Sequence, residues 1–378
     1  MGILQDLQEE MKELEKDYSH DGYWYSISGV LTILVCGMLC GLRQVDDIHD
    51  WAKAGPTKAF LQKQFGISKS PCRAQFYNIL ACVDAEKFSQ SFSRWMSTVL
   101  NGGTTGKTIS IDGKTICGTG KLSKDGSVLH IASALVSEQN LVIGSMDCGT
   151  KTGEQEAFRE LIELLDVNGS VIVADALHCS RKSAKTVIDN GAEYLFVVKN
   201  NTPRLREDIE LYFRDGQAPS HQTVEKNGGR IEKRTAYAST DTGWLYGKEQ
   251  WGKLSTIGAI HREFEKGGEK SSQWHYYISS AALSPQALLS HARLEWAVES
   301  MHWLLDVHFT EDKTRVWDMN VQKILNTTRK IALNMVRLFK TANLPERVPF
   351  TSVFKGNLFD TSELAKFLDF FSSRGKLD

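Results

Sequence analysis

Two acidic side chains follow short apolar runs, where a carboxylate can reach a substrate. Asp112 follows the run 108–111 and precedes a Gly-Lys pair, and Asp175 follows the run 171–174. A carboxylate at the end of a buried strand must be solvated, paired or bound to metal. The alternatives are an ordinary Asp-Gly-Lys turn for Asp112 and simple hydration for Asp175. Both aspartates are therefore candidate catalytic residues.

A third carboxylate comes from the segment 291–307, which has helical spacing. Its apolar residues form one stripe: Leu294, Val298, Met301 and Leu305. A second set with the same spacing lies on the adjacent face: Glu295, Glu299, His302 and Asp306. This face either borders the acidic site, with Glu299 as the third carboxylate, or faces solvent. Glu311, in the loop expected after the helix, competes with Glu299 for that role.

Three carboxylates from separate segments suit Mg²⁺ or Mn²⁺, which prefer oxygen ligands and keep waters for substrate phosphates. Two such ions ~3.5–4 Å apart can activate a water or a 3′-hydroxyl and stabilise the leaving oxygen. The sequence has no Gly-rich nucleotide loop, Ser-His-Asp pattern or zinc-ligand spacing. Metal-dependent phosphoryl transfer is the chemistry that these residues predict.

Local basic clusters predict a phosphate-bearing substrate, although the formal net charge of the chain is only −1. Residues after Asp175 and around 200–203 are basic, and so is the C-terminal helical part: Lys313, Arg315, Lys323, Arg329, Lys330, Arg337 and Lys340. Such patches can neutralise DNA phosphates, and a solvated helix face is the alternative.

Side chains near the acidic segments predict the DNA contacts. Trp296 and Trp303 could stack on an unpaired base or pack in the core, and His302 could orient a carboxylate or phosphate or lie on the surface. We expect DNA contacts from nine residues: Lys114, Arg181, Lys182, Lys199, Arg293, His302, Trp303, Lys313 and Arg315.

Composition favours a cytoplasmic protein. The seven cysteines are scattered and lack any C-x-x-C pair, which favours reduced thiols over disulfides or a zinc site. The first residues are charged and helical in pattern, unlike a signal peptide. The apolar stretch 27–42 is shorter than the ~20 residues needed to span a bilayer, so it predicts a buried helix and no membrane partner.

The periodicity predicts an α/β protein with added parts. Residues 1–105 predict an N-terminal helical domain. Residues 106–200 predict three antiparallel strands and then a helix–strand–helix–strand succession, which is typical of a mixed sheet with parallel strands in its second half. Asp112 and Asp175 then fall at C-terminal ends of strands, where sites on open α/β sheets gather.

The second half of the chain adds three further parts. Residues 201–288 predict a β-rich insertion, with strands near 231–238, 256–264 and 274–280. Residues 289–345 predict the last part of the core, including the acidic helix. Residues 346–378 form a C-terminal tail in which no pattern stands out.

Six motifs, taken in order, resemble a known family. They are IDGKT at 111–115, DALH at 175–178, AEYLFVVKN at 192–200, GRIE at 229–232, WAVESMHWLLDVHFTED at 296–312 and IALN at 331–334. Their combination resembles the H-repeat-associated proteins, a group of DDE transposases of bacterial insertion sequences. The resemblance covers residues 20–340.

This resemblance implies a ribonuclease-H-like core with flanking helices, in which the β-rich insertion precedes the last acidic helix. The motif match implies that Asp112, Asp175 and Glu299 are the catalytic and metal-binding triad, with Glu311 outside it. The implied activity is Mg²⁺-dependent (or Mn²⁺-dependent) cutting at element ends, followed by attack of the 3′-hydroxyl on target DNA. Double-stranded DNA is the implied partner, and pairing of two ends implies a homodimer on DNA.

Four positions differ from the family pattern. Related transposases usually carry a basic residue or histidine where this chain has Glu295. Glutamine is common where it has Ser180 and Asn201, and arginine where it has Cys117. An additional acid at Glu295 would weaken phosphate binding by like-charge repulsion. The alternative function is therefore a catalytically decayed transposase that binds DNA without cleaving it. A structure-selective nuclease that cuts without joining is a third interpretation.

Overall fold

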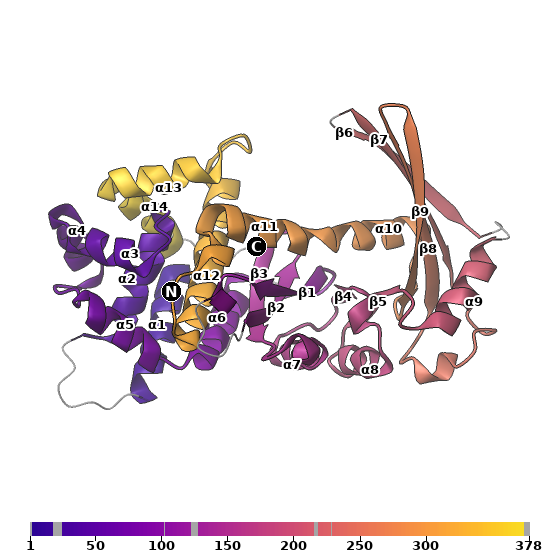
Figure 1. Ribbon diagram of the computed structural model, residues 1–378, viewed down its shortest axis with the longest axis horizontal. Helices are drawn as coiled ribbons and strands as arrows, with labels where there is room; N and C mark the ends of the chain where they lie inside the picture. The colour runs from indigo at the N-terminus through magenta and orange to yellow at the C-terminus, as the bar shows by residue number, and fades with distance from the viewer. Residues whose placement is uncertain are drawn as a thin grey trace.

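The computed structural model describes residues 2–17, 25–101, 103–121, 128–214, 218–227 and 229–373. The chain is a mixed α/β protein with three parts in a row (Figure 1). A helical body lies at one end, a sheet between helices lies in the middle, and strands extend beyond these layers at the other end.

Within the described residues, one sheet of nine strands runs through the middle and far parts of the molecule. The strands are β1 (Thr108–Ile116), β2 (Leu129–Val136), β3 (Leu141–Asp147), β4 (Val171–Ala174), β5 (Glu193–Val198), β6 (Ser220–Asn227), β7 (Arg230–Ser239), β8 (Thr256–Lys266) and β9 (Glu269–Ser279). Their order is β3-β2-β1-β4-β5-β9-β8-β7-β6. The first three strands are antiparallel, and β4 and β5 run parallel to β1, which confirms the predicted succession.

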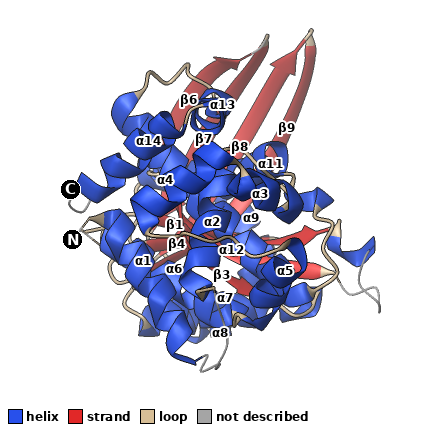
Figure 2. Cartoon of the chain, turned by 90° about the vertical axis from the view of Figure 1, so that its left-hand side faces the viewer, coloured by secondary structure: helices blue, strands red, loops and turns tan. Residues whose placement is uncertain are grey.

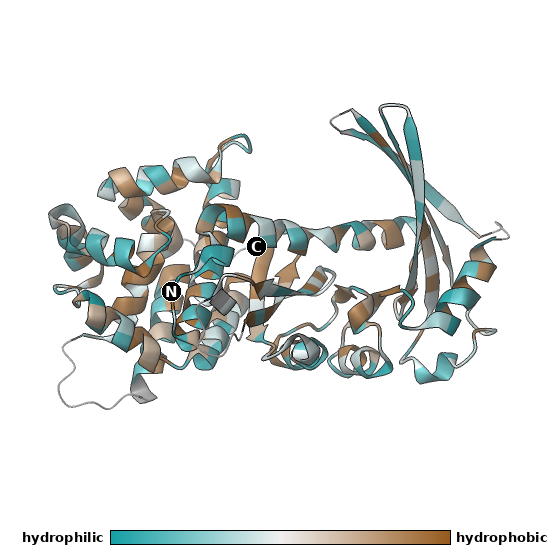
Figure 3. Cartoon of the chain, in the orientation of Figure 1, coloured by the Kyte–Doolittle hydropathy of each residue, from teal (hydrophilic) through white to brown (hydrophobic). Residues whose placement is uncertain are grey.

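The strands of the predicted β-rich insertion continue the same sheet. β9 pairs antiparallel with β5, and β8, β7 and β6 follow in antiparallel order. The far ends of these long strands are exposed and mostly hydrophilic (Figure 3). Two elements here were absent from the sequence interpretation: β6 and the helix α9 (Pro203–Arg214), which packs against β8 and β9.

Helices cover both faces of the middle part. α7 (Glu154–Leu164) and α8 (Arg181–Asp189) lie on one face, and α10 (Pro285–Leu294) and α11 (Trp296–Phe309) cross the other (Figure 1). α11 packs on β1 and β2, while α10 contacts β1, β4 and the outer strands β6–β8. This arrangement brings the predicted acidic helix directly over the strand that carries Asp112.

The helical body gathers both ends of the chain (Figure 2). Its helices are α1 (Ile3–Glu13), α2 (Ile27–Leu39), α3 (Val45–Lys53), α4 (Gly55–Phe65), α5 (Arg73–Cys82), α6 (Ala85–Val99), α12 (Met319–Asn343), α13 (Phe350–Phe359) and α14 (Thr361–Ser373). The predicted buried helix is α2, and none of the described helices is long and apolar enough to cross a bilayer. The segment 346–378, in which the sequence showed no pattern, contributes α13 and α14, which pack on α2, α1 and α4.

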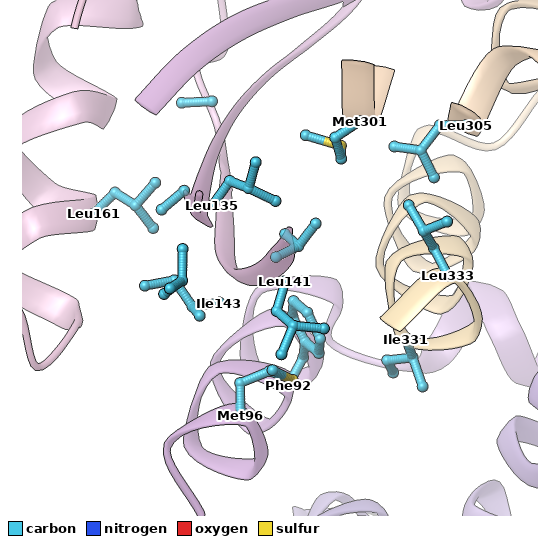
Figure 4. Close-up of a cluster of buried hydrophobic side chains, with 14 of the residues drawn as sticks. Phe92, Met96, Leu135, Leu141, Ile143, Leu161, Met301, Leu305, Ile331 and Leu333 are labelled. Atoms are coloured by element: carbon cyan, nitrogen blue, oxygen red, sulfur yellow. The ribbon is translucent and has the colours of Figure 1, made fainter. Parts of the chain in front are cut away.

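A continuous hydrophobic core joins the helical body to the sheet and to α11 (Figure 4). The side chains labelled there come from six elements: Phe92 and Met96 on α6, Leu135 on β2, Leu141 and Ile143 on β3, Leu161 on α7, Met301 and Leu305 on α11, and Ile331 and Leu333 on α12. Burial of a Met or Leu side chain stabilises a fold by about 1.5–3 kcal/mol. Met301 and Leu305 therefore hold α11 rigidly against the sheet.

The prediction that the basic residues of the C-terminal helix face DNA is wrong for most of α12. Arg329, Lys330 and Arg337 are buried, because α12 lies between the helical body and the sheet. Arg337 donates a hydrogen bond to the backbone carbonyl of Asn140, and Lys323 forms an ion pair with Asp147. These cations stabilise the fold instead of forming a DNA surface.

Candidate active site

Asp112 and Asp175 lie side by side on adjacent parallel strands. β1 and β4 pair in register, with Ser110 opposite Val173. Asp112 lies two residues after Ser110, and Asp175 lies two residues after Val173. Because side chains two residues apart point to the same face, both aspartates project from one face of strands that are about 4.8 Å apart. The long-range pairing of β1 with β4 thus brings the two carboxylates together.

The expectation that Asp112 lies at the C-terminal end of its strand is wrong. β1 continues through Gly113 and Lys114 to Ile116, because β2 pairs with it along this whole length. β4, which pairs with β1 on one side, ends at Ala174, before the position opposite Asp112. On that side, no described strand residue lies beside Asp112. Asp175 does end its strand, and its carboxylate accepts the backbone N–H of Leu177 at 2.8 Å.

The helix predicted over 291–307 is interrupted at Glu295. α10 ends at Leu294 and α11 begins at Trp296. Between them, the backbone N–H of Val298 donates a hydrogen bond to the carbonyl of Glu295, three residues earlier, at 3.4 Å. This tighter turn directs Glu295 toward the two aspartates, and Glu299 follows one turn later on α11. The predicted core stripe is confirmed for Val298, Met301 and Leu305, which are buried, whereas Leu294 at the end of α10 is only partly buried.

These carboxylates line one pocket of about 240 Å³ between the sheet and the α10–α11 junction. Its acidic lining consists of Asp112, Asp175, Glu295 and Glu299. Lys199, Arg293 and Trp296 also line it, as do side chains from the outer strands. His302 lies beside it, with its Nε2 3.6 Å from Oδ2 of Asp112. Three segments that are far apart in sequence therefore meet at one pocket.

The pKa of Glu295 reflects the negative charge that is gathered in this pocket. Burial, together with the neighbouring carboxylates of Asp175, Asp112 and Glu299, raises the pKa of the Glu295 carboxyl to about 7, against the opposing charge of Lys199. No described residue donates a hydrogen bond to this carboxylate. A cation or a proton in the pocket would relieve the repulsion between these acids.

The donor set of the pocket fits a hard divalent cation. All four acidic groups offer carboxylate oxygens, the ligands that Mg²⁺ and Mn²⁺ prefer. In the described part of the chain, no three His, Cys, Asp or Glu side chains are already arranged to hold a metal ion.

In metal-free buffer, Glu295→Gln is expected to be more stable than the wild type at pH 8, by about 3 kcal/mol. Because folding raises this pKa from 4.5 to about 7, the fold favours the protonated carboxyl. The wild type therefore loses stability as pH rises from 4.5 to 7, whereas the Gln variant does not. Urea unfolding in EDTA at several pH values measures the difference.

The advantage of Glu295→Gln should disappear near pH 4, where the wild-type carboxyl is protonated in both states. It should also shrink when Mg²⁺ is added at pH 8, because a cation offsets the repulsion that the proton relieves. Equal stability of the two proteins at every pH in EDTA would contradict this picture of the pocket.

Glu311, the competitor for the third carboxylate, lies outside the pocket. It is buried and accepts hydrogen bonds from Lys114 Nζ at 3.2 Å and Asn326 Nδ2 at 2.7 Å. Lys114, which was expected to contact DNA, also pairs with Asp306 at 2.6 Å and approaches Asp312. The structure thus places Lys114 and the buried Glu311 in a partly buried ion-pair cluster that links β1 to the end of α11.

The other residues that were predicted to contact DNA divide into a group at the pocket and a group on the exposed surface. Lys199 and Arg293 line the acidic pocket, and His302 lies beside it. Arg181 and Lys182 are exposed on α8, while Trp303, Lys313 and Arg315 are exposed on and after α11. Trp303 is 61% exposed, so it does not pack in the core. The structure brings the pocket residues together and leaves the exposed ones on flanking surfaces.

Arginines from the outer strands form a cationic wall that the sequence interpretation missed. Arg234 on β7 and Arg262 on β8 line the pocket opposite the carboxylates. Both bind Oε1 of Glu232, with Nη2 distances of 2.7 and 2.8 Å respectively, and the guanidinium of Arg262 lies 4.1 Å from the ring centroid of Trp296. The available signal was the GRIE motif, whose Glu232 orients both arginines.

Two of the positions that differ from the family pattern stabilise local structure. Asn201 Nδ2 donates to the carbonyl of Ala176, one residue after Asp175, at 2.5 Å. Ser180 caps α8 by accepting the N–H of Ser183. Asn201 thereby holds the segment that carries Asp175.

Comparison with known proteins assigns the family. Residues 103–335 match the transposase DDE domain, and residues 9–96 match the region described as DDE_Tnp_1-associated. The chain therefore belongs to the transposase DDE domain family. Its relatives include proteins named H repeat-associated transposases, which confirms the resemblance seen in the sequence motifs.

Individual relatives align over most of the chain. "Putative transposase YncI" of Escherichia coli O157:H7 is 29% identical over 325 residues, which cover 83% of this chain and 82% of that protein. "H repeat-associated putative transposase YhhI" of Escherichia coli K12 is 29% identical over 82% of this chain and 85% of that protein. Among solved structures, a piggyBac transposase synaptic complex with hairpin DNA aligns with a TM-score of 0.47 and 12% identity, over 100% of this chain and 80% of that one.

Proposed function

We propose that this chain is a DDE transposase with a ribonuclease-H-like core. In this proposal it cuts the ends of an insertion sequence and joins them to target DNA by two-metal phosphoryl transfer. One observation carries the proposal: Asp112, Asp175 and Glu299 line a single pocket in a protein of the transposase DDE domain family.

Within the pocket, Asp112, Asp175 and Glu299 would hold the divalent cations through their carboxylate oxygens. Mg²⁺ or Mn²⁺ bound there supplies an activated water or 3′-hydroxyl and stabilises the leaving oxygen. The position of Glu299 on a helix anchored in the core keeps its carboxylate at a fixed distance from the strands, as catalytic geometry requires.

The cationic wall would hold the DNA backbone over these carboxylates. Lys199 lines the pocket and can neutralise phosphates directly. Arg234, Arg262 and Arg293 can do so once a phosphate displaces their ion pairs with Glu232 and Glu225. The exposed residues flanking the pocket extend this contact along double-stranded DNA: Arg181, Lys182, Trp303, Lys313 and Arg315. Joining two element ends would require a homodimer on the DNA.

The test is cleavage of end-labelled DNA that carries the element's flanking repeats, with Mg²⁺, Mn²⁺ or EDTA. The proposal predicts metal-dependent cuts at the repeat ends and a joined product when target DNA is added. Cuts without a joined product, at sites unrelated to the repeats, would instead identify a nuclease.

Glu295 favours a second candidate, a catalytically decayed transposase that binds DNA without cleaving it. Its additional carboxylate faces the same pocket and repels phosphate at pH values above its pKa of about 7. This candidate predicts salt-sensitive binding to the repeats and no product with either metal. Restoration of cleavage by Glu295→His would identify Glu295 as the cause.

A further inference from the structure

A buried carboxylate lies on the face of the sheet opposite the pocket, close to both aspartate segments. Glu154 is the first residue of α7, and it lies between His130 on β2 and His178 in the short turn after Asp175. The exposed fractions of Glu154, His130 and His178 are 6%, 4% and 1%. The proposed chemistry gives none of these three a task.

Hydrogen bonds link this carboxylate to the strand of Asp112. Oε2 of Glu154 lies 2.7 Å from Nε2 of His130, and Nδ1 of the same ring lies 2.7 Å from the hydroxyl of Thr115 on β1. Glu154 is thereby connected through one imidazole to a residue three positions after Asp112.

The other oxygen faces the segment that carries Asp175. Oε1 of Glu154 lies 3.4 Å from Nε2 of His178, three residues after Asp175. The ring of His178 is stacked on Phe158 of α7, with centroids 4.3 Å apart, so its orientation is fixed by packing. One carboxylate therefore contacts both segments.

Gly113 shows how closely Glu154 approaches β1. A Cβ atom at Gly113 would lie 2.3 Å from the carboxyl carbon of Glu154, so any side chain there would displace the Glu154 carboxylate from this position. Consecutive strand residues point to opposite faces, so Asp112 faces the pocket while Gly113 leaves room for Glu154 beneath it. The glycine of the IDGKT motif thus permits this contact and does not form a turn.

The carboxylate is stabilised in its charged form. Burial alone would raise the pKa of Glu154, but the imidazole of His178 at 3.4 Å and the hydrogen-bonded imidazole of His130 outweigh burial and hold the pKa below its usual value. A charged, rigid and doubly held group can fix the distance between the two elements that it contacts.

We propose that Glu154 is a positioning residue, which through His130 and His178 fixes the spacing of Asp112 and Asp175 for divalent-metal binding. This inference rests on the proposed function of the pocket. Residues that orient metal ligands from behind typically change metal affinity or activity by 10–100-fold when replaced. Glu154→Gln keeps the shape of the side chain but removes its charge.

The experiment measures Mn²⁺ affinity by electron paramagnetic resonance, together with the Mn²⁺ concentration that gives half-maximal DNA cleavage. For Glu154→Gln, the Mn²⁺ dissociation constant and the half-maximal Mn²⁺ concentration are both expected to rise by about 10–100-fold, with DNA binding in EDTA unchanged. Thr115→Val removes only the hydrogen bond from Thr115 to His130, and it is expected to shift both values in the same direction by a smaller factor. This milder variant keeps the test decisive if Glu154→Gln does not fold.

Two control variants separate positioning from stability. Glu156→Gln removes an exposed charge from the same first turn of α7, and Val336→Ala lowers stability by a cavity in α12, away from the pocket. Both should keep the wild-type Mn²⁺ affinity. Folded Glu154→Gln and Thr115→Val proteins with wild-type affinity would overturn the positioning role alone. A wild type that binds no Mn²⁺ would overturn the proposed function, and the positioning role with it.

Discussion

Glu299→Gln is expected to reduce metal-dependent DNA cleavage by about 10²-fold or more, with little change in stability. The Glu299 carboxylate lines the pocket from the exposed side of α11, and no described residue forms an ion pair with it. The substitution therefore removes the proposed metal ligand but no contact that holds the fold together. The free energy of unfolding should stay within about 0.5 kcal/mol of the wild type.

Cleavage rates at saturating Mg²⁺ and urea unfolding, measured on the same preparations, check both expectations. Glu160→Gln, an exposed substitution on α7, is the matched control and should cleave at the wild-type rate. Undiminished cleavage by Glu299→Gln would exclude it as the third carboxylate. Glu295, one turn earlier on the same pocket wall, would then be the carboxylate to replace.

Glu311→Gln is expected to have the opposite profile, a loss of about 3–5 kcal/mol in the free energy of unfolding. Glu311 is buried and is the shared partner of Lys114 and Asn326. The buried Lys330 lies nearby, and burial lowers the pKa of its ammonium group to about 7 against the opposing charge of Glu311. Removal of this carboxylate leaves buried cations without compensation.

Chemical denaturation measures this loss, and Asp312→Asn provides the comparison. Asp312 is only partly buried and lies 3.8 Å from Lys114, so its replacement should cost much less than that of Glu311. The fraction of Glu311→Gln that stays folded should retain metal-dependent cleavage. A stable Glu311→Gln protein without cleavage would contradict the assignment of a structural role to Glu311.

Local periodicity was sufficient to predict most elements of the core. The apolar runs before Asp112 and Asp175 are strands, and the stripe of Val298, Met301 and Leu305 is the buried face of α11. Each of these signals depends on residues that are close in sequence. The same patterns identified the buried helix α2.

Features that depend on distant partners were missed. The length of β1 is set by its pairing with β2, which no pattern around Asp112 reveals. The interruption at Glu295 results from the way α10 and α11 pack on the sheet. Burial of Lys330 in α12 likewise depends on the helices and strands around it, since a buried lysine has the same sequence pattern as a solvated one.

Convergence of the site could be expected from the motif match but not from spacing. Asp112 and Asp175 become neighbours only through the parallel pairing of β1 with β4. Arg234 and Arg262 reach the pocket from strands whose position in the sheet follows from the pairing of β9 with β5. Charged residues that alternate along strands give no sign of which site they face.

The most direct test is the position of Mn²⁺, located by anomalous scattering in crystals of the wild-type protein soaked in MnCl₂. The structure predicts a peak in the acidic pocket within about 2–2.3 Å of carboxylate oxygens of Asp112, Asp175 and Glu299. The peak should be lost in crystals of an Asp112→Asn/Asp175→Asn variant. A wild-type pocket without Mn²⁺, or a peak only at the cluster of Asp306, Glu311 and Asp312, would contradict the assignment of these three residues as the metal site.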